Sequence, residues 1–239
     1  MIVYRIKIIK LKVDNIEHTY IIGDVHGCFY TLQRLLNQLP LDANIIFVGD
    51  LCDRGLHTKE VIELVIKNSY YCILGNHDDY MISHIKDCMD DSNLKVKWNQ
   101  EEYMGGKQTL LSYTDDYDTM IKHLKWLKKI PRYIEINKYF ITHGFGLPYY
   151  RRRKNSSSHV GLLKNRIKDK EGWGHDWEKD WKNYNVTNIF GHTDYDEVEI
   201  GKNYYGIDTG CVYGKKLTAI QLRTMNLYQQ EIDVRDIRN

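Results

Sequence analysis

The sequence predicts an α/β fold, α+β by some schemes, built on a sheet in which neighbouring strands run parallel. Strand-like and helix-like segments alternate through residues 17–79. Each apolar run in this region ends at a glycine and is followed by polar residues, as in "IIFVGDLCDRG". More short strand-like segments follow near the C-terminus, at residues 188–193, 203–210, 216–222 and 227–234. Alternation of this kind is typical of parallel sheets, and the late strands predict a further β layer.

Apolar spacing divides the first third of the chain into elements. Residues 2–12 and 17–23 are expected to form two strands of a hairpin. The leucines within residues 32–39 recur at helical spacing, and Pro40 ends that helix. The next expected elements are a strand at 45–48, a helix at 58–68 and a strand at 70–79.

The middle of the chain, residues 80–130, is polar and has helical spacing, which predicts a helical insertion. Residues 133–144 return to strands, and residues 149–185 have no regular pattern. No segment has the composition of a linker. We therefore expect a single domain covering residues 1–239.

Composition argues against several classes of protein. A chain of 239 residues with 42% hydrophobic residues can fill a core. A formal charge of +2 gives no case for a nucleic-acid or membrane surface, and no apolar run is long enough to span a bilayer. Five scattered cysteines without a CxxC pair predict reduced thiols and a cytoplasmic location.

Metal-capable side chains follow five of the expected strands. They are Asp24 and His26 in "GDVHG", Asp50 in "GDLCDRG", Asn76 and His77 in "GNHD", His143 in "THG", and His192 in "GHT". One Gly-Asp pair is usually an ordinary turn, and one such histidine is usually a packing or surface residue. Five exits of this kind favour a shared site, because open α/β sheets bind ligands outside the carboxyl ends of their strands. Carboxylates, imidazoles and one amide suit Mn²⁺, Fe²⁺ or Zn²⁺.

The ordered motifs "GDVHG … GDLCDRG … GNHD … HG … GHT" resemble the signature of the PPP-type calcineurin-like metallophosphatases. That signature is GDxHG, GDxxDRG and GNHE followed by two later histidines. The similarity extends over roughly residues 19–222 and includes segments between the motifs that resemble those of small bacterial and phage serine/threonine phosphatases. It implies a four-layer β-sandwich flanked by helices, and a hydrolase acting on phosphoric ester bonds.

The resemblance also implies a cofactor of two divalent metal ions, with Mn²⁺ favoured and Fe or Zn as alternatives. Asp50 would bridge the two metals. Asp24 and His26 would complete the first site, and the second site would take Asn76, His143 and His192. Two such cations clamp a phosphoryl group and activate a water that attacks phosphorus directly.

Three further roles are implied close to these ligands. His77 would protonate the leaving oxygen, and Asp53 would orient His77 and favour its cationic form. Arg54 would hold phosphate oxygens with its planar fork, beside Asn76. A second phosphate-binding arginine is expected at Arg166, although Lys164 stands where the family has tryptophan. Arg151, Arg152 and Arg153 compete for that role, and a solvated basic loop is their simpler interpretation.

Other departures from the family pattern bear on the substrate. Asp78 replaces the glutamate of GNHE, as in some dinucleoside tetraphosphate hydrolases, yet Asp53 is a residue that those hydrolases often lack. Phe145 replaces a small residue after His143, and packing is the simpler account of it. Tyr213 is a candidate to reach the site, and Asp208 is expected to fix a local turn or a ligand histidine.

From sequence we expect a phosphomonoesterase acting on phosphoserine or phosphothreonine proteins. The alternative is a pyrophosphohydrolase of dinucleoside polyphosphates or capped RNA ends. A third hypothesis is a metal-binding protein without turnover. The expected partner is a phosphoprotein or a small phosphoester, with no membrane and with nucleic acid only as an RNA-end substrate.

Overall fold

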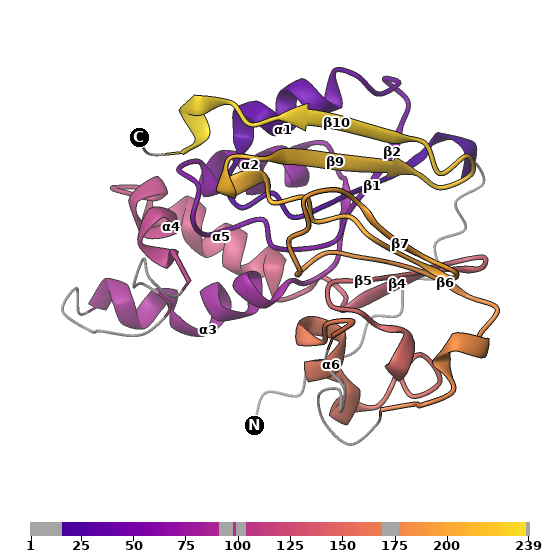
Figure 1. Cartoon of the computed structure of the whole chain (residues 1–239). Coiled ribbons are helices and arrows are strands. Elements are labelled where there is room, and N and C mark those ends of the chain that lie inside the picture. The colour runs from indigo at the N-terminus through magenta and orange to yellow at the C-terminus, as the bar shows by residue number, and fades with distance from the viewer. Residues whose placement is uncertain (1–15, 91–97, 99–103, 169–176, 238–239) are drawn as a thin grey trace.

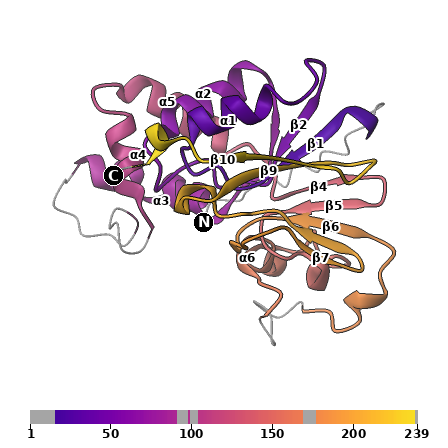
Figure 2. The same ribbon diagram turned by 45° about the horizontal axis from the view of Figure 1, so that its top comes forward.

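The computed structural model describes residues 16–90, 98, 104–168 and 177–237. Two five-stranded sheets lie against each other, with helices outside them (Figures 1 and 2). The strand expected at residues 2–12 lies outside the described residues. None of the helices in the described part of the chain is long and apolar enough to cross a bilayer.

The first sheet contains the three N-terminal strands and the two last strands. Its order is β10 (Leu227–Glu231), β9 (Lys216–Gln221), β1 (Thr19–Ile22), β2 (Asn44–Phe47) and β3 (Tyr71–Cys72). β1, β2 and β3 run parallel, as expected from the alternation of strands and helices. β9 pairs antiparallel with the other edge of β1, so β1 is an inner strand.

The second sheet is built from the remaining strands. Its order is β4 (Tyr133–Ile136), β5 (Tyr139–Thr142), β6 (Thr187–Phe190), β8 (Tyr204–Gly206) and β7 (Glu199–Gly201). β5, β6 and β8 run parallel to one another, so their carboxyl ends share one edge of the sheet. β4 and β7 are antiparallel edge strands.

Six helices surround the sheets in the described part of the chain. They are α1 (Phe29–Leu36), α2 (Thr58–Lys67), α3 (Asn76–Asp90), α4 (Gly106–Ser112), α5 (Tyr117–Leu127) and α6 (His159–Lys164). α3, α4 and α5 occupy the region where a helical insertion is expected. Asp116 caps the N-terminus of α5, because its carboxylate accepts a hydrogen bond from the backbone N–H of Thr119.

The packing explains why the strands are apolar on both faces. Between the sheets, Ile21 and Ile46 of the first sheet share one buried cluster with Ile141 and Ile189 of the second. On the other face of the first sheet, α1 and α2 contribute leucine and valine side chains to a larger cluster. On the other face of the second sheet, Phe140 packs with the α6 residue Leu162. The fold is therefore the predicted α/β sandwich flanked by helices.

The C-terminal strands differ from the expectation of one β layer. β9 and β10 extend the first sheet, whereas β6, β7 and β8 belong to the second. β7 was not expected, and it forms the antiparallel partner of β8. β3 is shorter than the expected strand at 70–79, because the chain enters α3 at Asn76.

Candidate active site

Side chains that follow five strands, three in the first sheet and two in the second, lie close together. Oδ2 of Asp50 lies 3.3 Å from Nε2 of His143 and 3.6 Å from Nε2 of His26. Oδ1 of Asn76 lies 2.9 Å from Nε2 of His143. The ring centroids of His143 and His192 are 5.2 Å apart. Residues from β1, β2, β3, β5 and β6 are thereby brought together, as the strand-end argument predicts.

Unusual backbone conformations aim these side chains inward. His26, Asp50 and His192 have positive φ angles of 47°, 49° and 68°. Such conformations are strained in non-glycine residues and hold only where their surroundings enforce them. The flanking glycines have a steric purpose as well, because a Cβ at Gly75 would lie 2.0 Å from Oδ1 of Asp50. A Cβ at Gly191 would lie 1.9 Å from a carboxylate oxygen of Asp24.

The donor set fits divalent cations. Nδ1 of His26 donates to the carbonyl of Cys52 at 2.8 Å, and Nδ1 of His143 donates to the carbonyl of Val48 at 2.9 Å. A histidine held in this way leaves the lone pair of Nε2 able to bind a metal, and in His26 that lone pair accepts a hydrogen bond from Arg54. Among the described residues, no hydrogen-bond partner reaches the buried Oδ1 of Asp24. A carboxylate oxygen without a hydrogen-bond donor, and an imidazole lone pair that faces another acceptor, both lack a positively charged partner. A divalent cation would provide that partner.

In the described part of the chain, two groups of buried carboxylate and imidazole ligands have atoms within 4.8 Å of one another. One contains His26, Asp50 and His77, and the other contains Asp24, Asp50 and His143. Asp50 belongs to both groups, as expected of a bridging ligand. The grouping differs from the predicted partition in two ways: His77, expected as a proton donor, belongs to the first group, and Asp24, expected with His26, lies with His143 in the second.

Burial and neighbouring charges shape the titration of the site. Burial, with the carboxylates of Asp208 and Asp50 beside it, raises the pKa of Asp24 well above its usual range. Burial alone would raise the pKa of Asp50 too, but the imidazoles of His143 and His77 hold it well below. Burial and the charge of His143 lower the pKa of His192 to about 3, so its imidazole is neutral and able to bind a metal.

His77 is held by a carboxylate that is itself fully fixed. Nδ1 of His77 donates to Oδ2 of Asp53 at 2.7 Å. The same oxygen accepts from Nε1 of Trp98 at 2.8 Å, and Oδ1 accepts from the hydroxyl of Thr109 at 2.8 Å. Asp53 is completely buried. The predicted Asp53–His77 pair therefore exists, and Trp98 is a partner that no pattern in the sequence indicated.

Arg54 lies on the His26 side of the site. Its Nη1 donates to Nε2 of His26 at 2.6 Å, and its backbone N–H donates to the carbonyl of Gly105 at 3.0 Å. Its guanidinium carbon lies 5.3 Å from the ring centre of Tyr213, which is 53% exposed. Tyr213 therefore reaches the site through Arg54, and an open aromatic face stands next to the predicted phosphate-binding group.

Arg166 and Lys164 lie on the other side, next to the second-sheet histidines. The guanidinium of Arg166 contributes, after burial and His143, to the low pKa of His192. Nζ of Lys164 donates to the hydroxyl of Tyr80 at 3.2 Å and sits 4.8 Å from its ring centre. Tyr80 is one helical turn after Asn76.

The competing arginines are engaged elsewhere. Arg151 pairs with Asp180 at 2.9 Å, and Arg153 pairs with Glu135 at 2.9 Å. Glu135 belongs to the edge strand β4. Both contacts match the interpretation of the 151–153 segment as a basic surface loop.

Asp78 does more than begin a helix. Its carboxylate accepts the backbone N–H groups of Asp50 at 2.9 Å, Leu51 at 3.0 Å and Gly75 at 3.0 Å. Asp78 thus ties the loop of the bridging carboxylate to the start of α3. Phe145 is buried against Trp181, Phe190 and Tyr204, so packing accounts for it.

Asp208 fixes a turn, as expected. Its Oδ1 accepts the backbone N–H of Gly210 at 3.0 Å. It also lies close to Asp24, and burial raises the pKa of Asp208 to about 6. Asp208 therefore stands beside Asp24, a predicted metal ligand, whereas the sequence suggested a contact with a ligand histidine.

The family model for calcineurin-like phosphoesterases matches residues 18–198. The chain belongs to this family. The phosphoesterase is therefore a hydrolase of phosphoester bonds, from a family that uses divalent metals. The relationship confirms the resemblance seen in the ordered motifs.

Two relatives of similar length are named as bis(5'-nucleosyl)-tetraphosphatases. The phosphoesterase is 30% identical to the asymmetrical bis(5'-nucleosyl)-tetraphosphatase PrpE of Oceanobacillus iheyensis, over 83% of this chain and 86% of the relative. It is 28% identical to PrpE of Anoxybacillus flavithermus, over 86% of this chain and 90% of that one.

Solved structures confirm the fold. A candidate diadenosine tetraphosphatase superposes with a TM-score of 0.71 at 20% identity, covering 96% of this chain and 100% of the other. A serine/threonine phosphatase of Saccharomyces cerevisiae, described as similar to human PP5, gives 0.60 at 14% identity, covering 90% and 79%.

Proposed function

We propose that this phosphoesterase hydrolyses a phosphoanhydride bond of dinucleoside polyphosphates, releasing two nucleotides. This choice reverses the preference from sequence, which placed phosphoproteins first. The similarity to bis(5'-nucleosyl)-tetraphosphatases over most of both chains supports it. Within the structure, the observation that carries it is Lys164, a cation near Arg166 where the resembled phosphatases have tryptophan. A polyphosphate chain carries several negative charges, and this chain offers cations on both sides of the predicted metal ligands, Arg54 on one side and Arg166 and Lys164 on the other.

The residues of this chain have separate tasks in the proposed reaction. Asp24, His26, Asp50, Asn76, His143 and His192 would hold two divalent metals. When bound, the metals supply Lewis-acid polarisation of the phosphoryl group and a water of lowered pKa. Arg54 and Arg166 orient the phosphate that is attacked. Because Nδ1 of His77 donates to Asp53, Nε2 is the nitrogen from which a proton can pass to the leaving oxygen.

A second candidate is hydrolysis of phosphomonoesters, including phosphoserine and phosphothreonine. The observation that favours it is the buried Asp53–His77 pair. The alkoxide of a serine side chain is a strong base and needs a proton as it leaves. A nucleoside triphosphate is a far weaker base and can leave with less help.

The two candidates are separated by a substrate panel. The purified protein is loaded with Mn²⁺, Fe²⁺ or Zn²⁺ and given diadenosine tetraphosphate, p-nitrophenyl phosphate, bis-p-nitrophenyl phosphate or a phosphothreonine peptide. We expect kcat/KM for the dinucleotide to exceed that for the peptide by at least about 100-fold, which is the order that polar recognition of a substrate provides. Faster turnover of the peptide would replace the first candidate with the second. Binding of Mn²⁺ without turnover of any substrate would indicate the binding protein considered from sequence.

A further inference from the structure

The N-terminus of α1 is capped by a residue from the far end of the chain. Cys28 occupies the position before the helix and makes no side-chain capping bond. The carboxylate of Asp236 instead accepts the backbone N–H of Tyr30 at 3.0 Å and that of Thr31 at 2.8 Å. It also accepts the hydroxyl of Thr31 at 2.7 Å. These are the two N–H groups that a capping side chain normally satisfies.

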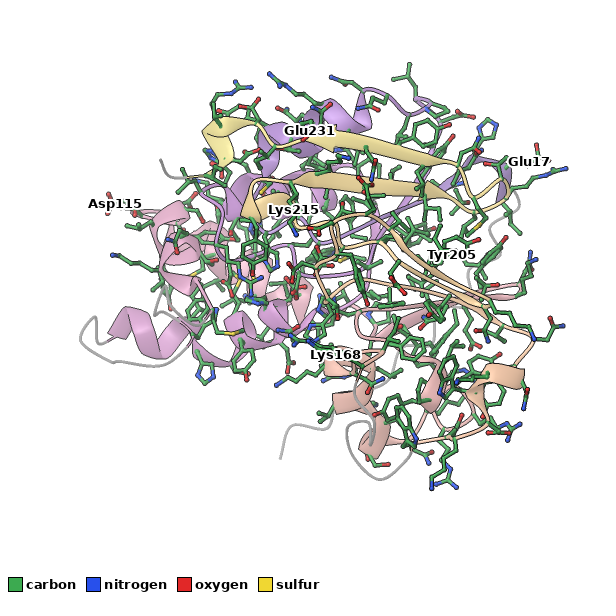
Figure 3. All side chains as sticks on the ribbon, in the orientation of Figure 1. Glu17, Asp115, Lys168, Tyr205, Lys215 and Glu231 are labelled. Carbon is green, nitrogen blue, oxygen red and sulfur yellow. The ribbon has the colours of Figure 1, made fainter. Side chains whose placement is uncertain are left out.

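The same C-terminal turn holds a second loop. The backbone carbonyl of Asp236 accepts the N–H of Leu56 at 3.1 Å. Nε2 of His57 donates to the carbonyl of Arg235 at 2.9 Å. Asp236 is completely buried, so water does not compete for these bonds. Residues 235–236 therefore join α1 to the segment that follows Arg54, and Figure 3 shows the end of β10 at Glu231 close to α1.

Both loops carry predicted metal ligands. α1 begins three residues after His26, and the loop from Asp50 to Gly55 precedes Leu56. The loops are also bonded to each other, since the N–H of Gly55 donates to the carbonyl of His26 at 3.0 Å. Strained residues such as His26 and Asp50 keep their conformation only where several contacts enforce it.

We propose that Asp236 is a positioning residue for the metal site formed by Asp24 and His26. It binds no metal itself. By capping α1 and holding Leu56, it keeps the two ligand loops in register, so its loss weakens this metal more than the one held by Asn76 and His143. The proposal rests on the metal site and is independent of which phosphoester is the substrate.

A matched control lies three residues earlier. The carboxylate of Asp233 pairs with Arg235 at 2.7 Å and with Arg34 at 3.1 Å, and both arginines are more than half exposed. Asp233 contacts Thr31 only through its backbone N–H, which a substitution retains. The same carboxylate accepts the backbone N–H of Arg235 at 3.1 Å, so Asp233→Ala removes the cap of this turn. It leaves the bonds of Asp236 to α1 in place and therefore separates a loosened turn from an uncapped α1.

The test is titration of metal-free protein with Mn²⁺, following free Mn²⁺ by its electron paramagnetic resonance signal. We expect Asp236→Ala to weaken one of two Mn²⁺ sites about 10-fold and to leave the other within about 2-fold, as for supports of metal ligands elsewhere. Asp236→Asn, which keeps one acceptor oxygen, should restore part of the affinity, and Asp233→Ala should bind as wild type. Unchanged affinity at both sites in folded Asp236→Ala, or an equal loss at both, would overturn the proposal.

A milder variant keeps the test decisive if Asp236→Ala does not fold. Thr31→Val removes the hydroxyl that donates to Asp236 and accepts the backbone N–H of Asp233, and it leaves in place both backbone N–H groups that Asp236 accepts. We expect about 3–10-fold weaker binding at the same single site, the effect of losing these two hydrogen bonds. Wild-type affinity at both sites in Thr31→Val would then contradict the positioning role.

Discussion

The two sheets make unequal contributions to the site. The loops after β1, β2 and β3 carry buried groups whose hydrogen bonds are made within the protein. Asp53 accepts bonds from His77, Trp98 and Thr109, and Asp78 accepts three backbone N–H groups. On this side, the reacting groups are fixed before any substrate arrives.

The second sheet supplies His143 and His192 from β5 and β6, and beyond them a more open rim. Lys164 is the last residue of α6 and Arg166 comes shortly after it, and both side chains are neither buried nor fully exposed. Lys164 reaches across to Tyr80 of α3 and so connects this rim with the first half.

This difference suggests a division of tasks, with catalysis in the first-sheet loops and substrate choice at the second-sheet rim. A buried charge is costly unless its partners are complete, so the first half cannot change one residue without changing several. A half-exposed cation can be exchanged at little cost to folding. We infer that the first half determines what reaction occurs, and the second-sheet rim determines which phosphoester enters. The four predictions below test this division.

The largest effect is expected at Asp50, where the two halves meet. Asp50→Asn removes the carboxylate charge common to both ligand groups. We expect loss of both metals and at least about 10³-fold lower kcat on every substrate, the order associated with removing a central electrostatic group. Metal content measured by mass spectrometry and turnover should fall together. Asp115→Asn, at an exposed site seen in Figure 3, is the control. Retention of both metals by Asp50→Asn would contradict the bridging role.

The next effect concerns the proton donor of the first half. His77→Asn should keep both metals, because the ligands expected to hold them are unchanged. We expect kcat to fall roughly 10²–10⁴-fold for a phosphothreonine peptide and much less for p-nitrophenyl phosphate, whose leaving group needs no proton. A plot of log kcat against the leaving-group pKa should become steeper. Full activity on the peptide would exclude His77 as the acid.

Many of the predicted metal ligands could be found from sequence because each lies just after the end of a strand. Asp24, Asp50 and His143 each come one residue after an apolar run ends, so a one-dimensional pattern locates them. Trp98 and Asp236 could not be found in this way, because their contacts depend on segments distant in the chain. The hydrogen bond from Trp98 to Asp53 spans 45 residues, and the contacts of Asp236 with α1 span more than 200.

The sequence also did not predict which strands belong to which sheet. β9 is buried along its middle and fits either sheet equally well, whereas β10 is polar and partly exposed, so neither strand gave a sign that it extends the first sheet. The boundary of β3 was missed for a different reason. The polar residues after it form the first turn of α3, and Asp78 in that turn binds the N–H of Gly75. A polar strand exit and a helix start have the same composition.

A smaller effect is expected on the second-sheet side, where two arginines can be compared. Arg166→Gln removes a cation close to His192, whereas Arg151→Gln breaks an exposed pair with Asp180. We expect about 10–100-fold lower kcat/KM for Arg166→Gln, the value of a charged hydrogen bond to phosphate, with metal content unchanged. Arg151→Gln should match wild type, since exposed pairs contribute little. The reverse order would move the second phosphate contact to the surface loop.

The smallest effect is the most selective. Lys164→Met keeps the length and apolar stem of the side chain but removes its charge and its bond to Tyr80. We expect KM for diadenosine tetraphosphate to rise about 5-fold, as for loss of one half-exposed charge pair, and kcat to change little. For p-nitrophenyl phosphate, which is too short to reach the rim, neither parameter should change. Tyr80→Phe is the control, because it removes the hydroxyl and leaves the cation. Equal losses on both substrates would show that Lys164 supports the chemistry, and the proposed separation of the two halves would fail at this residue.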